Sequence, residues 1–282
     1  MLWRQLKLFA SATTASLILS WAAGGSLAMA QTSELVDRSQ LRVCADPSNL
    51  PFSNKKGEGF ENKIAEIISE ELDVPIKYTW FPQSIGFIRQ TLDKKRCDII
   101  IGYVATHELV LNSNPYYRTS YVLIHRDGEL EGFKSLNDPR IKPMKIGVIA
   151  GTPPVSILAE NKLLDNIKSF HRMVDRRYYS PAEEMIADIS EGRLDIGLLW
   201  GPIGGYFAEK ADKKLTVVPL IHETVGPRMS YRITFGVRRR EKVWKRQLNR
   251  IIRRRQDDIN KILVEYGVPL IDEAGELIKP AG

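Results

Sequence analysis

Residue types that commonly carry out chemistry are present in this sequence, but without the spacings that such chemistry requires. The four histidines stand apart, with no H-E-x-x-H pair and no cysteines at metal-ligand spacing; they are His107, His125, His171 and His222. The sequence also has no G-x-S-x-G nucleophile elbow, no C-x-x-C-H haem site, no EF-hand spacing and no dinucleotide-binding glycine pattern. These patterns predict a protein that is not an enzyme, has no catalytic residues and holds neither a metal nor an organic cofactor.

Residues suited to ligand binding are concentrated instead in residues 41–72, LRVCADPSNLPFSNKKGEGFENKIAEIISEEL. This segment begins with an apolar run of strand length, Leu41 to Ala45, and continues through Pro, Asn, Ser and Gly residues that favour turns. Apolar side chains from Phe60 to Leu72 then recur at helical spacing. Open α/β sheets bind ligands at loops that leave the carboxyl end of a strand, so we expect this loop to contribute to a site.

The first 30 residues have the composition of an export signal. Arg4 and Lys7 precede an apolar core at residues 17–23, and residues 28–30 (AMA) form a small-residue cleavage site. We therefore expect a cleavable signal peptide and a mature periplasmic protein that starts at Gln31 and is not inserted in the membrane. The alternative is an uncleaved anchor, but the apolar run is short and is interrupted by Ser and Thr.

The mature chain has 282 minus 30, or 252, residues, which is enough for two α/β lobes of about 100–150 residues each. The net charge of +7 falls to +5 when Arg4 and Lys7 are removed. Residues 238–255 contain ten Lys or Arg against Glu241 alone, so the rest of the mature chain has a net charge of −4. Because the positive charge is local, we expect no nucleic-acid partner.

This basic run lies on a predicted helix, residues 241–266. Its apolar stripe consists of Trp244, Leu248, Ile251, Ile252, Ile259, Ile262 and Leu263. The basic side chains lie off that stripe and form either an ordinary solvated face or an electrostatic docking patch for an acidic partner. In the second case the docking candidates are Arg246, Arg250 and Arg253.

The second half of the chain repeats the order of elements in the first half. A strand at residues 145–149 is followed by a helix, and Ser180 with Glu183 has the capping residues of a further helix. Residues 96–99 (RCDI) and residues 193–196 (RLDI) each lead into an apolar strand. This weak repeat predicts two similar α/β lobes.

Several of these segments resemble the type II periplasmic solute-binding proteins, the class that includes amino-acid receptors. The segments CADPSNLPFSN, GFENKIAE, RCDIIIG and PYYRTSYV are more similar to one subgroup of that class. This subgroup consists of the solute-binding-like accessory proteins that are encoded beside PQQ-dependent methanol and alcohol dehydrogenases, the MxaJ/XoxJ type. The resemblance extends from residue 41 to about residue 269.

The resemblance implies a two-lobed α/β fold of the type II periplasmic-binding-protein class. Each lobe would contain a doubly wound, mostly parallel sheet, and two hinge crossings would join the lobes. The implied division is a signal peptide at 1–30, lobe 1 at 31–122 together with 238–282, and lobe 2 at 123–237. We expect a turn at residues 114–117, a first crossing at 121–125 and a return crossing at 233–237.

The resemblance also implies a ligand cleft between the lobes, lined by the loops that follow the strands. The candidates are Asp46, Asn49, Phe52, Glu61, Gln83, Tyr103, Thr106, Gly151, Thr152, Trp200 and Pro202. Gly151 and Thr152 would offer backbone N–H groups to an anion, and Phe52 and Trp200 would enclose an apolar or cyclic group. Each candidate also has a local interpretation, because Asp46 commonly stabilises a turn and Trp200 fits a core position.

One position departs from the amino-acid-binding pattern. Relatives of that kind carry a T-x-x-R segment whose Arg binds the ligand carboxylate with two hydrogen bonds. Here the matching segment is Thr106-His107-Glu108-Leu109, so Leu109 stands in place of the Arg. We therefore expect free amino acids to bind weakly or not at all.

The sequence contains two cysteines, Cys44 and Cys97. An even number in an exported chain indicates a disulfide, and the alternative is two buried free thiols. In the type II fold the strands that carry these positions are neighbours, so the resemblance implies a Cys44–Cys97 bridge.

The resemblance thus implies a monomeric periplasmic accessory protein that supports a PQQ-dependent methanol or alcohol dehydrogenase in maturation, activation or docking. One alternative is the substrate-binding subunit of an ABC importer for an unidentified small molecule. Another is a periplasmic dehydratase on the same fold, with Glu61 or Asp46 as its acid.

Overall fold

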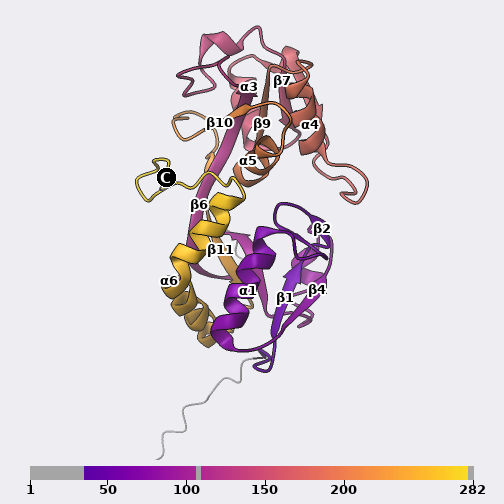
Figure 1. Ribbon diagram of the computed structural model, residues 1–282, viewed down its shortest axis with the longest axis vertical. Coiled ribbons are helices and arrows are strands. Elements are labelled where there is room, and N and C mark those ends of the chain that lie inside the picture. Colours follow the sequence, from indigo (N-terminus) through magenta and orange to yellow (C-terminus); the bar gives the residue numbers. More distant parts are fainter. Residues whose placement is uncertain (1–34, 106–108, 279–282) are drawn as a thin grey trace, which may run out of the picture. The chain divides into compact units, whose positions relative to one another are not determined.

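Residues 35–105 and 109–278 are described by the computed structural model shown in Figure 1. The predicted signal peptide and Thr106 lie outside the described residues. Within the described part of the chain, none of the helices combines the length and the apolar character needed to cross a membrane.

The first part of the central sheet consists of three parallel strands, and the predicted ligand loop follows the first of them in the chain. They are β1 (Leu41–Ala45), β4 (Ile76–Trp80) and β5 (Ile99–Val104), in the order β4-β1-β5. Helix α1 (Phe60–Leu72) follows the loop and buries Phe60, Ile64 and Ile68, which recur every four residues. Between β1 and α1 the chain forms a small hairpin of β2 (Ser48–Asn49) and β3 (Ser53–Asn54). The short helix α2 (Phe87–Gln90) precedes β5.

The second part of the sheet repeats this parallel arrangement. Its strands are β7 (Ile146–Ile149), β8 (Ile167–Phe170) and β9 (Ile196–Trp200), with β10 (Leu215–Pro219) paired to β6 (Leu111–Arg126). Its helices are α3 (Pro153–Glu160), α4 (Pro181–Ser190) and α5 (Gly201–Glu209), with short 3-10 turns η1 (Pro139–Ile141) and η2 (Leu164–Asn166). The predicted cap of α4 is present, because the Ser180 hydroxyl accepts a hydrogen bond from the Glu183 N–H at 3.3 Å.

Strand β6 (Leu111–Arg126) connects the two parts of the sheet. It pairs antiparallel with β11 (Ser230–Val237) and, further along, with β9. The turn expected at residues 114–117 is therefore wrong, because these residues continue the strand. Pro115 lacks an N–H, but it lies where the β6–β11 register shifts, and such an irregularity tolerates a proline inside a sheet.

Helix α6 (Lys242–Glu265) follows β11 and lies beside α1 (Figure 1). Six of the seven residues in its predicted apolar stripe are buried, and the seventh, Ile262, packs against the same core while half-buried. The backbone of α6 departs from helical geometry at Arg255. Because the apolar stripe faces the core, Arg246, Arg250 and Arg253 are exposed on the opposite side of the helix.

The apolar cores divide in the same way as the strands. One cluster joins β1, α1, β5, β11 and α6 and is centred on side chains such as Phe60, Ile64 and Leu248. Two further clusters cover β7 and β9 together with helices α3, α4 and α5. The structure therefore confirms a mixed α/β fold with a mostly parallel central sheet, whereas the exact lobe boundaries remain predictions.

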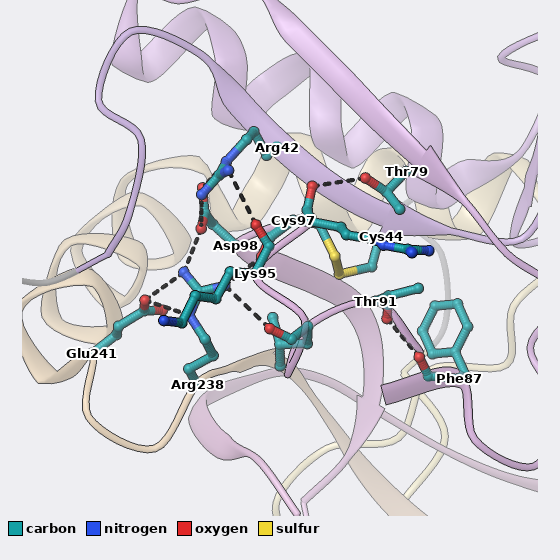
Figure 2. Close-up of a disulfide and its surroundings, with 12 residues drawn as sticks. Arg42, Cys44, Thr79, Phe87, Thr91, Lys95, Cys97, Asp98, Arg238 and Glu241 are labelled. Atoms are coloured by element: carbon teal, nitrogen blue, oxygen red, sulfur yellow. Dashed lines mark hydrogen bonds and ion pairs between the residues drawn. A yellow bond between two sulfur atoms is a disulfide. The ribbon is translucent and has the colours of Figure 1, made fainter. Parts of the chain in front are cut away.

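The predicted disulfide is present between Cys44 in β1 and Cys97, two residues before β5 (Figure 2). The two Cα atoms are 5.4 Å apart, and both cysteines are buried. Phe87, Leu92 and Ile100 pack around the bridge. The disulfide therefore links β1 to the segment that leads into β5 and is packed within an apolar cluster.

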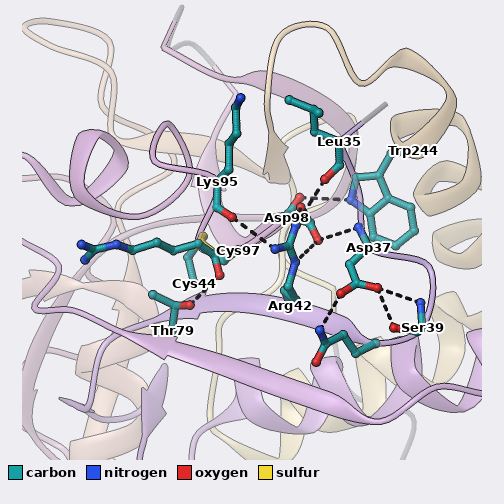
Figure 3. Close-up of polar contacts among 12 residues, drawn as sticks. Leu35, Asp37, Ser39, Arg42, Cys44, Thr79, Lys95, Cys97, Asp98 and Trp244 are labelled. Atoms are coloured by element: carbon teal, nitrogen blue, oxygen red, sulfur yellow. Dashed lines mark hydrogen bonds and ion pairs between the residues drawn. A yellow bond between two sulfur atoms is a disulfide. The ribbon is translucent and has the colours of Figure 1, made fainter. Parts of the chain in front are cut away.

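Next to the disulfide, Asp98 is the centre of a buried cluster of charges (Figure 3). Its carboxylate accepts hydrogen bonds from Arg42 Nε and Nη2, each at 2.7 Å, and forms an ion pair with Arg238. The Trp244 indole N–H donates to the Asp98 backbone carbonyl at 3.1 Å, and Arg238 also pairs with Glu241 (Figures 2 and 3). Arg238 therefore holds the start of α6 against the sheet and does not belong to the exposed basic face.

Candidate functional site

A cavity of about 490 Å³ is lined by residues from both parts of the sheet. Five of the predicted site residues line it: Asn49, Phe52, Gln83, Thr152 and Trp200. Four others do not, although they lie in or next to the elements that surround it: Asp46, Glu61, Tyr103 and Gly151. Pro202 also does not line the cavity, and Thr106 lies outside the described residues.

Asp46 does not line the cavity, but its hydrogen bonds position residues that do. Its two carboxylate oxygens accept the backbone N–H groups of Ser48, at 2.9 Å, and of Gln83, at 2.6 Å. The Asn49 side-chain amide then donates to Gln83 Oε1 at 3.0 Å. Asp46 thus holds two lining residues, Ser48 and Gln83, directly, and Gln83 in turn holds Asn49, in agreement with the interpretation of Asp46 as a turn-stabilising residue.

The segment between β8 and α4, residues 171–179, reaches this wall from the second part of the sheet. Arg176 Nη1 lies 3.8 Å from Asp46 Oδ2, and the Ser48 hydroxyl donates to the Arg176 carbonyl at 3.4 Å. A neighbouring hollow of about 510 Å³ continues along the same segment and is lined by Asp46, Arg172 and Arg177 among others. The segment therefore borders both the cavity and the neighbouring hollow.

Three aromatic rings form one side of the cavity. The ring centroids of Tyr121 and Trp200 are 5.1 Å apart, those of Trp200 and Tyr231 5.8 Å, and those of Tyr121 and Tyr231 6.5 Å, all in edge-on arrangements. The cross-strand pair Tyr121–Trp200 joins β6 to β9. Phe52 also lines the cavity, from the first part of the sheet. The sequence prediction missed Tyr121 and Tyr231, because they become neighbours of Trp200 only through the antiparallel pairing of β6 with β9 and β11.

The N-terminus of α3 offers fewer free backbone N–H groups to a bound anion than a helix N-terminus usually does. Thr152 is the N-cap, but Pro153 and Pro154 lack N–H groups and the Val155 N–H donates to the Thr152 carbonyl at 3.1 Å. The Thr152 hydroxyl donates to the Ile149 carbonyl at 2.6 Å. An anion bound here would therefore depend on side chains as well as on the backbone.

Arg172 supplies such a side chain, and the sequence prediction missed it. It lines the cavity, is exposed, and forms no hydrogen bond or ion pair with any residue in the described ranges. Burial and the neighbouring Tyr231 raise the pKa of Tyr121 to about 12, and the positive charge of Arg172 opposes that shift. The Tyr121 hydroxyl therefore stays protonated at neutral pH, and Tyr121 and Arg172 both line the cavity.

Glu61 occupies a buried position behind β5 and does not line the cavity. Burial, followed by the negative charge of Asp46, raises the pKa of Glu61 to about 8, so its carboxyl is protonated at neutral pH. The carboxyl fits because residue 102 is a glycine, and a Cβ at that position would collide with Glu61 Oε1. In the described ranges, no group of three or more His, Cys, Asp or Glu side chains is arranged to hold a metal ion.

The predicted docking residues lie on α6 and do not line this cavity. Arg246, Arg250 and Arg253 are exposed, and none forms an ion pair with another described residue. By contrast, Arg254 and Arg255 pair with Glu71 and Glu70 of α1. The basic run therefore contains both structural arginines and a free, exposed group.

The profile of the family "Bacterial extracellular solute-binding proteins, family 3" matches residues 41–268. The solved structure of the periplasmic binding protein XoxJ from Methylobacterium extorquens AM1 is 45% identical, with a TM-score of 0.72. That match covers 83% of this chain and 100% of XoxJ. Protein MoxJ from Methylorubrum extorquens is 30% identical over 249 residues, 83% of each chain. Protein MoxJ from Paracoccus denitrificans is 24% identical over 269 residues, 89% of this chain and 95% of that protein.

Proposed function

We propose that this chain, which belongs to family 3 of the bacterial extracellular solute-binding proteins, is a periplasmic accessory protein of a PQQ-dependent methanol or alcohol dehydrogenase. The observation that carries this proposal is the 45% identity to XoxJ over the whole of that chain. The MoxJ relatives support it over most of their length. The protein would act in maturation, activation or docking of the enzyme.

The position of Leu109 supports an accessory role over the capture of free amino acids. Leu109 is 58% exposed, just before β6, and takes the place of the carboxylate-binding Arg of amino-acid receptors. A leucine offers no charge and no donor to a carboxylate. The prediction that common amino acids bind weakly therefore remains, and calorimetry with the common amino acids tests it.

We place the docking surface on α6, at Arg246, Arg250 and Arg253. Their spacing of four and three residues puts them on one side of the helix, before the irregularity at Arg255. Exposed arginines without ion pairs attract an acidic partner and accelerate its association, and this effect weakens as salt screens the charges.

A pull-down from periplasmic extract with the immobilised mature protein tests this surface. The wild-type chain should retain the dehydrogenase at low salt, and the variant R246E/R250E/R253E should lose most of it. A matched control, K134E/K142E/K213E, makes the same change of charge at exposed lysines of the second part of the sheet and should bind as the wild type does. Equal retention by the two triple variants, with unchanged melting temperatures, would contradict the proposed surface.

A second candidate function is the substrate-binding subunit of an ABC importer. The observation that favours it is the cavity of about 490 Å³, a volume in the usual range for small-molecule sites. Loss of uptake of one solute in a deletion strain would support this candidate. The dehydratase alternative gains nothing from Glu61, because that carboxyl is buried outside the cavity.

The periplasmic address and the lobe division are part of the same proposal. Membership of an extracellular family supports export, and N-terminal sequencing of the periplasmic protein should give Gln31 as its first residue. The separate apolar cores support lobe 1 at 31–122 with 238–282 and lobe 2 at 123–237.

A further inference from the structure

The cavity has a chemical character that the proposed partnership with a dehydrogenase does not explain. From its lining we infer that it binds an aromatic carboxylate that has no ammonium group, with the ring against Trp200 and the carboxylate on Arg172. This inference goes beyond the proposed function, and either can hold without the other.

The aromatic side of the cavity indicates that the apolar part of the ligand is a flat ring. Tyr121, Trp200 and Tyr231 contact one another through their edges, and Leu199, Ile203 and Phe207 extend the apolar lining. A flat ring placed on this surface would gain both apolar burial and edge-to-face contacts. The volume of about 490 Å³ accommodates a bicyclic ring with a short side chain.

The charged groups around the cavity indicate which polar group the ligand carries. They are Arg172, Arg176 and Glu183, with His171 beside them. Arg176 already faces Asp46 at 3.8 Å, so its charge is partly compensated. Arg172 has no such partner among the described residues, and Tyr121, whose hydroxyl is protonated at neutral pH, lines the same cavity. A guanidinium and a phenol O–H are both donors, so together they suit a carboxylate.

Glu183 is the carboxylate that an amino acid's ammonium group would need. It lies in the first turn of α4, where the positive end of the helix stabilises a negative side chain, and it is exposed to solvent. An ammonium group near Arg172 would also be repelled by the guanidinium. Because Glu183 is exposed, an ion pair between it and an ammonium group would add little to affinity, so the lining favours an acid without an amine over the corresponding amino acid.

Three ligands of matched shape separate these possibilities: indole-3-propionate, its neutral amide, and tryptophan. Calorimetry with the mature protein should show the acid binding about tenfold or more tightly than the amide and than tryptophan. Equal affinities for the acid and the amide, tighter binding of tryptophan, or no binding of the acid would each overturn the inference.

Two single variants identify the group that binds the carboxylate. R172Q should lower the affinity for the acid about tenfold, to that of the amide, and should leave the amide unaffected. The control R177Q changes an arginine of the same segment that pairs with Asp175 and lines the neighbouring hollow but not the cavity of about 490 Å³, so it should bind the acid as the wild type does. Because both arginines are exposed, both variants should fold, and an equal loss of affinity in both would refute the role of Arg172. Neither result changes what is expected in the pull-down of the dehydrogenase, so the two proposals can fail separately.

Discussion

Asp98 and Asp195 occupy the same place in the two parts of the sheet, directly before β5 and β9. Both backbone N–H groups donate to a carbonyl near the start of the neighbouring strand: Asp98 to that of Arg42, the second residue of β1, at 2.7 Å, and Asp195 to that of Lys145, directly before β7, at 3.0 Å. Their side chains differ. The Asp98 side chain is 1% exposed and pairs with two arginines, whereas that of Asp195 is 34% exposed and lies 3.4 Å from Arg126.

The residues that precede these aspartates differ in the same direction. Cys97 is bonded to Cys44, while Leu194 packs in an apolar cluster with α4. A repeated backbone arrangement thus carries two kinds of stabilisation. At this position the first part adds a covalent bond and buried charges to its apolar core, whereas the second part has apolar packing and a half-exposed ion pair. The segment 171–179, which borders the cavity, belongs to the second part.

The largest expected difference between the two parts is at these aspartates. D98A leaves the guanidinium groups of Arg42 and Arg238 partly buried without a carboxylate, and should lower the free energy of unfolding by about 3–5 kcal/mol. D195A removes a half-exposed ion pair and the hydrogen bond that Asp195 accepts from the Lys145 N–H at 2.7 Å, and should cost about 1–2 kcal/mol. Urea unfolding of the two variants measures both values. Similar costs would mean that the buried charges do not distinguish the two parts.

The disulfide is expected to contribute next. The bridge encloses a loop of 53 residues, and loss of loop-closure entropy in the unfolded chain sets its contribution at about 4 kcal/mol or less. The variant C44S/C97S should therefore unfold at lower urea concentration than the wild type, with both proteins unreduced. A variant as stable as the wild type would show that the first part does not depend on its covalent bond.

Glu61 should make stability depend on pH. Folding raises its pKa from 4.5 to about 8, so the folded state holds a proton that the unfolded state has lost. The stabilisation is complete below pH 4.5 and is lost as the pH rises to about 8, with a slope of at most about 1.4 kcal/mol per pH unit. E61Q, which keeps the shape of the side chain without the titration, should flatten this dependence. The exposed control E66Q should leave the slope unchanged.

The smallest expected effect is at the helix cap of the second part. The Ser180 hydroxyl accepts the Glu183 N–H, and S180A should cost about 1 kcal/mol. Helix α1 has no equivalent side chain, because its N-cap is Gly59, where a Cβ would collide with the Phe52 carbonyl. A melting temperature of S180A equal to that of the wild type would show that capping does not stabilise the second part.

The sequence predicted those parts of the molecule that depend on local pattern. The strand-loop-helix of residues 41–72, the apolar stripe of α6 and the Ser180 cap follow from residue periodicity and capping chemistry. The path of β6 through Pro115 was missed, because a local turn signal was overridden by pairing with β11.

The site was harder to predict, since its members come together only in the fold. Tyr121, Tyr231 and Arg172 lie on separate strands and a loop, and no spacing in the sequence relates them to Trp200. Asp46 and Glu61 were predicted to line the cleft, but neither lines the cavity. Their burial behind the cavity wall depends on neighbours, such as Gly102, that belong to other strands.

The central claim is that the protein serves a PQQ-dependent dehydrogenase. The most direct measurement is PQQ-dependent alcohol oxidation in a strain from which the gene is deleted, together with uptake of solutes by the same cells. The account predicts that alcohol oxidation falls, that the wild-type gene restores it, and that solute uptake is unchanged. Normal alcohol oxidation in the deletion strain, together with loss of uptake of one solute, would contradict the account and support an importer subunit instead.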